Sequence, residues 1–185
     1  MRSQAGVITP ILAAAIIAVS TLFAGCATGH ISDYSLVSPV ASRKPVFEDS
    51  DVRLAIRVVD DSRYSLELAN KTGAPLMIAW AGSTLRSADG GNEELAYKLG
   101  NGGKDVTESH LETTVAPGGV VVVEVYPAAN VYVDEQGVGR VYPLYCKGSP
   151  VGDPRSLDGR EIGVNLVVII DDHARSYPLM LKVKM

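Results

Sequence analysis

The stretch IGVNLVVIIDDHARSYPLMLKVK, residues 162–184, contains the clearest structural pattern of the chain. Its first part, 162–170, is apolar and rich in β-branched residues, which favour strands. The polar segment 171–175 indicates a turn, because aspartate side chains readily hydrogen-bond to nearby backbone. The last segment alternates between two sets of side chains: Tyr177, Leu179, Leu181 and Val183 on one face, and Pro178, Met180, Lys182 and Lys184 on the other. This period of two predicts a C-terminal β-hairpin, and since Pro178 cannot donate to a ladder we expect its strand at a sheet edge.

Similar patterns fill the chain upstream of this hairpin. Half-buried strands are predicted at 52–59 and 64–70, where apolar side chains recur at every second position. The apolar run from Leu76 to Trp80 is interpreted as a central strand buried on both faces, with Trp80 as its largest core side chain. The remaining predicted elements are strands at 94–99, 120–126 and 141–146, a hairpin tip at 134–139 and a long loop at 147–160.

The whole pattern is that of an all-β protein. No segment has a sustained helical period, and short strands separated by Gly- and Pro-containing turns are typical of a sandwich. The hydrophobic fraction of 46% is sufficient for one core. We predict one antiparallel, immunoglobulin-like β-sandwich domain over residues 47–185.

The first 25 residues have the three parts of a secretory signal peptide. Arg2 provides the positive start, the run from Ile11 to Phe23 is uncharged, and the small residues Ala24 and Gly25 precede Cys26. The run is shorter than the roughly 20 apolar residues that a bilayer-spanning helix needs. We therefore predict a signal peptide over residues 1–25, and not a transmembrane anchor.

The segment Phe23-Ala24-Gly25-Cys26 resembles the lipobox of bacterial lipoproteins, although that family usually has leucine where this chain has Phe23. The resemblance implies cleavage before Cys26 and acylation of its thiol and new amino terminus. Ordinary cleavage, with Cys26 kept as a structural cysteine, is the alternative. Each buried methylene contributes about 0.8 kcal/mol, so two or more acyl chains hold a protein on a membrane durably.

The lipoprotein resemblance also implies a location. Ala27 follows the cysteine where an aspartate would resemble an inner-membrane retention signal, so we expect the outer membrane, with the domain facing the periplasm. Residues 26–46 begin with the acylated cysteine and continue as a Ser-, Pro- and Gly-rich stretch without a period, interpreted as a flexible tether. The formal net charge of −4 argues against a nucleic-acid partner, since such proteins carry basic patches.

The sequence contains no credible catalytic or metal-binding constellation, so no catalytic residue, metal or cofactor is predicted. The three histidines show no paired spacing. Asp171-Asp172-His173 resembles a cation or acid–base cluster but is interpreted as a solvated turn, as is Asp60-Asp61. Cys146, the only other cysteine, is interpreted as a buried thiol in a strand, with a reactive thiol as the alternative.

Tyrosines provide the one feature that favours an interaction surface. Four of the eight lie within 20 residues of one another: Tyr126, Tyr132, Tyr142 and Tyr145. Tyrosine is enriched at binding surfaces and is equally common in strands. We treat the four as a candidate partner surface.

A second resemblance supports the predicted fold. Asn70-Lys71-Thr72, the apolar stretch that reaches Trp80 and the Asp89-Gly90 turn resemble immunoglobulin-type domains of bacterial envelope lipoproteins. These residues cover about a fifth of the chain. The resemblance supports the fold and implies no particular activity.

The sequence-based hypothesis is a non-enzymatic envelope lipoprotein that binds the membrane through acyl chains on Cys26 and acts as an interaction or assembly module for an envelope protein. Its C-terminal strand, residues 174–185, is the candidate for pairing with a partner strand. The alternative is a periplasmic small-molecule or glycan binder, with loops 82–92 and 147–160 as the walls of its pocket.

Overall fold

The computed structural model describes residue 31 and residues 33–99, 112–149 and 152–185. The strands are β1 (Asp33–Ser38), β2 (Val46–Glu48), β3 (Val52–Val59), β4 (Arg63–Asn70), β5 (Leu76–Ile78), β6 (Thr84–Arg86), β7 (Asn92–Leu99), β8 (Thr113–Val115), β9 (Val120–Pro127), β10 (Val131–Val133), β11 (Gly139–Val141), β12 (Glu161–Ile170) and β13 (His173–Lys184). Three short 3₁₀ turns complete the described elements: η1 (Trp80–Gly82), η2 (Ala128–Asn130) and η3 (Pro154–Leu157). The predicted all-β character is confirmed.

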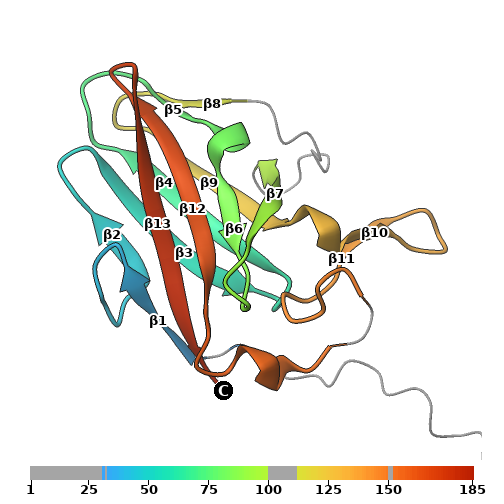
Figure 1. Cartoon of the computed structure of the whole chain (residues 1–185). Coiled ribbons are helices and arrows are strands. Elements are labelled where there is room, and N and C mark those ends of the chain that lie inside the picture. The colour runs from blue at the N-terminus through green and yellow to red at the C-terminus, as the bar shows by residue number, and fades with distance from the viewer. Residues whose placement is uncertain (1–30, 32, 100–111, 150–151) are drawn as a thin grey trace, which may run out of the picture.

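Eleven strands form one antiparallel sheet (Figure 1). Hydrogen-bonded neighbours follow the order β1-β13-β12-β6-β7-β9-β4-β3-β2, while β5 pairs with β12 and β8. β10 and β11 form a separate two-stranded ribbon. The nine-strand path curls until it nearly closes on itself.

This arrangement is not a clear immunoglobulin-like sandwich, so that finer prediction is not confirmed. The reason lies in β7, whose first residues, Asn92–Glu94, pair with β6 and whose later residues, Leu95–Leu99, pair with β9. One strand thereby continues the hydrogen-bonded ladder from one half of the sheet into the other. An immunoglobulin-like fold instead keeps two separate sheets face to face.

The C-terminal hairpin is confirmed, with a tighter turn than the sequence indicated. β12 and β13 pair from Glu161–Lys182 to Ile170–His173, so only Asp171 and Asp172 form the turn. Both have a left-handed backbone, with φ of 50° and 63°. Two left-handed residues characterise the type I′ turn, whose twist matches that of the flanking strands.

The predicted edge position of the last strand is wrong. β13 pairs with β12 on one side and with β1 on the other, where the register extends from Asp33–Lys184 to Ser38–Met180. Pro178 lies outside the stretch that β1 covers. The proline therefore meets a neighbouring strand on the β12 side only, which explains why a ladder paired on both sides tolerates it.

The strand β1 also corrects the predicted tether, because residues 33–38 belong to the sheet. Leu36 is 1% exposed and contributes to the core. The Tyr34 hydroxyl accepts a hydrogen bond from the Val58 amide at 3.3 Å. Just before β1, the Ile31 amide donates to the Asp61 carboxylate at 2.6 Å. The polar composition of this stretch concealed a strand that is anchored by a partner far away in the sequence.

The core lies inside the curled sheet and contains the inward-facing residues of β3, β4, β9, β12 and β13. The expected strand from Leu76 to Trp80 is shorter than predicted: β5 ends at Ile78, and Met77 is partly exposed between two buried neighbours. Trp80 itself is buried in η1, as a core residue should be. Its ring stacks on Tyr97 at 4.3 Å between ring centroids.

A single hydrogen bond satisfies the polar atom of this buried indole. Trp80 Nε1 donates to Thr113 Oγ1 at 2.8 Å. Thr113→Val removes the acceptor while keeping the shape, so we expect the free energy of unfolding to fall by about 1–2 kcal/mol. Urea denaturation followed by the fluorescence of Trp80, the only tryptophan of the chain, measures this loss. Thr114 is exposed, so Thr114→Val makes the same chemical change and should hardly alter the free energy of unfolding. Equal losses in the two variants would contradict the role of Thr113 as the acceptor for Trp80.

Candidate functional site

The predicted lipidation site and signal peptide lie outside the described residues. The same is true of His30 and His110. Cys146 is a buried cysteine, 2% exposed, but it lies in a bend and not in a strand because β11 ends at Val141. In the part of the chain that the structure describes, no helix is long and apolar enough to cross a membrane.

The four candidate tyrosines do not form one surface. Tyr126 and Tyr145 are buried, at 3% and 9% exposure, so they cannot contact a partner. Tyr132 and Tyr142 are half-buried and stack on each other across the β10–β11 ribbon, with ring centroids 4.0 Å apart. The stack covers one ring face of Tyr132 and one of Tyr142, and both side chains stay partly exposed. The expected surface of four tyrosines is therefore limited to these two.

The two aspartate pairs differ in their surroundings. Asp171 and Asp172 are exposed at the tip of the C-terminal hairpin, as predicted. Asp61 is 7% exposed, which contradicts its assignment to a solvated turn. Its carboxylate accepts from Ile31, and its carbonyl accepts from Leu144 at 2.8 Å. Among the described residues, no group of three or more His, Cys, Asp or Glu side chains is placed to hold a metal ion.

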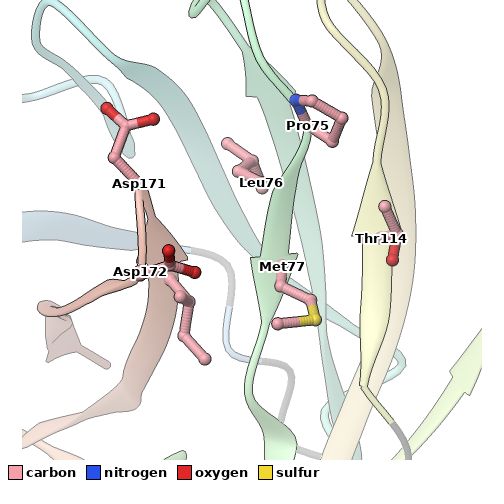
Figure 2. Close-up of a pocket in the computed structure, with 7 residues that line it drawn as sticks. Pro75, Leu76, Met77, Thr114, Asp171 and Asp172 are labelled. Atoms are coloured by element: carbon pink, nitrogen blue, oxygen red, sulfur yellow. The ribbon is translucent and has the colours of Figure 1, made fainter.

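A pocket of about 220 Å³ lies beside the Asp171–Asp172 turn, and we call it the distal pocket (Figure 2). It is lined by Pro75, Leu76, Met77, Thr114, Ile169, Asp171 and Asp172. The floor follows from strand register, because Ile169, Met77 and Thr114 are direct cross-strand neighbours on β12, β5 and β8. Opposed residues of antiparallel strands share a face, so their side chains form one row on the outer side of the sheet.

Two carboxylates stand at the rim of this apolar floor. In Figure 2 the Asp172 side chain turns toward the β5 side of the pocket, whereas Asp171 points away from Met77 at the outer lip. Neither carboxylate forms a hydrogen bond or an ion pair with another described residue. The distal pocket thus combines an apolar surface with negative charge that no cation of the described chain neutralises.

A second hollow of similar size differs in its charge. It also measures about 220 Å³ and lies across β2, β3, β4 and β9, with Val46, Ala55 and Val122 among its lining residues. Arg57 and Glu67 bring opposite charges to it, and Glu67 already pairs with Arg53 at 2.6 Å. This hollow therefore has no net charge that would select a ligand.

The loops expected to form a ligand pocket do not line the distal pocket. Asp158 and Gly159 of the second loop border a separate hollow of about 200 Å³ beside β1 and β13. Residues 85–88 of the first loop border a small cavity of about 20 Å³, beside Tyr64 and Glu93. That volume accommodates about one water molecule. Sequence reasoning missed Met77 and Ile169 as candidate residues, since both were assigned to buried strands.

Tyr64, which lines this small cavity, affects the stability of the protein at high pH. Burial raises the pKa of Tyr64 above its ordinary value, and the Glu93 charge raises it further. Above a pH of about 10 the unfolded chain releases the Tyr64 proton while the folded chain keeps it, so the free energy of unfolding falls as pH rises. We expect Tyr64→Phe to remove up to about 1.4 kcal/mol of this loss per pH unit. Urea denaturation between pH 8 and pH 11 measures it, and an unchanged slope in the variant would contradict the assignment.

Comparisons of the chain with protein-family models, curated proteins and solved structures find no match, so no family membership or residue role is transferred to it from a relative.

Proposed function

We propose that this protein is a non-enzymatic lipoprotein of the bacterial envelope, attached by acyl chains on Cys26 to the periplasmic face of the outer membrane, and that it presents its β domain to an envelope protein partner. The observation that carries the proposal is the short distance along the chain between the lipobox-like segment and the fold. Only residues 27–32 separate Cys26 from the first residue of β1. Six residues span at most about 20 Å, so the domain is held close to the membrane.

This attachment orients the domain. β13 begins at the Asp171–Asp172 turn and ends beside Asp33, the first residue of β1. Its 12 residues correspond to roughly 40 Å of strand. The distal pocket therefore lies at the end of the sheet opposite the start of β1 (Figure 1), and the proposed attachment at Cys26 precedes β1 in the chain. A partner that approaches from the periplasm would meet this end first.

The route to a partner differs from the one that the sequence suggested. Residues 174–185 lie in a strand that already pairs on both sides, so strand addition at the C-terminal strand is no longer proposed. Of the strands on the main path, β1 and β2 are the end members, and β2 has only three residues. An edge strand as short as β2 is a poor template for pairing with another chain, and the edge of β1 is partly covered by the bridge between Leu36 and Ser42. Contact through side chains at the distal end is the better-supported route.

Acylation of Cys26 is the first test. Cells that express the full chain are grown with an alkyne-labelled palmitate analogue and then fractionated. We expect the label and the membrane association in the wild type and the loss of both in Cys26→Ser. The matched control, Cys146→Ser, changes the other cysteine and should keep the label. A wild type without label, or a Cys26→Ser variant that stays labelled, would refute the lipid anchor.

The second candidate function is the binding of a free small molecule, which the distal pocket favours by its apolar floor and polar rim. Against it stands the volume of about 220 Å³, below the roughly 300–1,000 Å³ of typical ligand sites. A thermal-shift screen of periplasmic metabolites and glycans separates the two functions. One compound that raises the melting temperature saturably, and fails to do so in a Met77→Ala variant, would favour the small-molecule function.

A further inference from the structure

We infer that the distal pocket is a docking site for one basic side chain, lysine or arginine, of the partner protein, with the aliphatic stem on the row formed by Ile169 and Met77 and the cationic head at the Asp172 carboxylate. Asp171 adds a second negative charge at the outer lip. The identity of the occupant as a protein side chain rests on the proposed function. The preference for a basic, chain-like group rests on the pocket alone.

The shape of the pocket matches one long side chain. A volume of about 220 Å³ is too small for a drug-sized ligand. Met77 and Ile169 are each partly exposed, and they provide an apolar surface beside a charged rim. Lysine and arginine have this same division, because their methylene stems pack on apolar surface while the charged head stays near water.

The charge of the rim determines the sign of the occupant. Asp171 and Asp172 are adjacent, exposed and without an ion-pair partner among the described residues. By contrast, the aspartates of several other turns are paired: Asp60 with Arg63 at 3.1 Å, Asp134 with Arg140 at 2.9 Å, and Asp89 with Lys147. Within the described part of the chain, the negative charge of the distal pocket is therefore unbalanced, and such charge attracts a cation and repels acidic partners.

The geometry also argues for a side chain in preference to a bare metal ion. The pocket offers two carboxylates from neighbouring residues and the Thr114 side chain, and no group of three metal-binding side chains is present in the described part of the chain. Calcium takes six to eight oxygen ligands. An apolar floor of Leu76, Met77 and Ile169 contributes none, whereas it suits a methylene stem.

Methionine methyl groups provide a local reporter. The acylated protein is labelled with [¹³C-methyl]methionine, purified in uncharged detergent micelles and titrated with Nα-acetyl-lysine methylamide. Met77 lines the pocket, whereas Met180 and Met185 do not and serve as internal references. Met→Leu variants assign the signals. We expect only the Met77 signal to move, and to saturate at a Kd on the order of 1–10 mM, with a similar response to the arginine analogue.

Two controls isolate the charge. Nα-acetyl-norleucine methylamide has the same stem without the ammonium group and should bind at least about tenfold more weakly, which corresponds to about 1.4 kcal/mol. Asp171→Asn/Asp172→Asn removes both carboxylates, and asparagine tolerates the left-handed backbone of this turn. We expect a loss of affinity of similar size. Asp60→Asn makes the same change at another left-handed turn and should leave the affinity unchanged.

Three outcomes would overturn the inference. The first is a Met77 signal that ignores the lysine probe or responds equally to norleucine. The second is an undiminished response in the double asparagine variant. The third is a response to free 1,5-diaminopentane at least about tenfold stronger than to the lysine probe, which would assign the site to a soluble amine. None of these depends on the anchor, so an unacylated protein with an intact Met77 response would refute the proposed function and leave the site standing.

Discussion

Asn70→Ala is expected to lower the free energy of unfolding by about 2–3 kcal/mol. Asn70 is 2% exposed at the end of β4. Its Nδ2 group donates to the carbonyls of Ala74, Val115 and Ala116 at 2.8, 3.0 and 3.1 Å, and its Oδ1 accepts from the Thr72 amide at 2.9 Å. With alanine, the Thr72 amide and the buried Val115 carbonyl lose this partner, while the carbonyls of Ala74 and Ala116 keep hydrogen bonds from Thr72 Oγ1 and the Gly119 amide. A buried polar group left without a partner costs about 1–3 kcal/mol.

Chemical denaturation of the full chain in uncharged detergent measures this loss, with Asn92→Ala as the matched control. Asn92 is exposed at the start of β7, so its replacement should change stability by less than about 0.5 kcal/mol. Asn70→Asp provides a second readout. Its carboxylate would face three carbonyl oxygens, which raises its pKa above the ordinary value of about 3.9, so its folded state gains stability as pH falls toward that value. A loss of less than about 1 kcal/mol in the free energy of unfolding of Asn70→Ala would contradict the role of Asn70. An Asn70→Asp variant without this pH response would contradict it as well.

Gly163→Ala is the second substitution with a large expected effect, a loss of about 3 kcal/mol or more. A Cβ atom at this position would lie 2.1 Å from the Leu179 carbonyl oxygen and 3.0 Å from the Met180 Cα. Both are backbone atoms of β13, so no side-chain rotation relieves the contact. β12 pairs here with Arg86 of β6 on its other side, which leaves it no room to shift. The clash therefore strains three neighbouring strands at once.

Gly73→Ala is the control for this substitution, because a Cβ atom there would meet nothing within 4 Å. We expect it to be neutral within about 0.5 kcal/mol. Thermal unfolding followed by far-UV circular dichroism compares the two variants. If Gly163→Ala keeps the wild-type melting temperature, the close approach of β12 and β13 at this position is incorrect.

The hydrogen bonds of Asn70 explain what the resemblance of Asn70-Lys71-Thr72 to immunoglobulin-type envelope domains can indicate. In this structure the asparagine joins the end of β4 to the segment before β5 and to the turn after β8. Such a junction is useful in many β folds, whatever the order of their strands. The motif was therefore compatible with an all-β domain and carried no information on whether the sheet divides in two.

Strand positions were the most predictable feature, because alternation is a local property of the sequence. β3, β4, β9 and β12 lie within one or two residues of the predicted strands. The predictions failed where a long-range partner decides the structure. The polar residues 33–38 form a strand because β13 provides a ladder, and residues 142–146 turn away after β11. Burial of Asp61, Tyr126 and Tyr145 depends equally on distant neighbours.

The sequence by itself determined the all-β class, the C-terminal hairpin, the core face of each long strand and the lipobox-like segment that predicts the anchor. Each of these depends on residues near one another in the chain. The tertiary structure decided that β7 joins the two halves of the sheet and that Met77, Ile169, Asp171 and Asp172 border one pocket. These residues come from segments more than 90 positions apart. Strand register brings them together, and register depends on how the whole sheet packs.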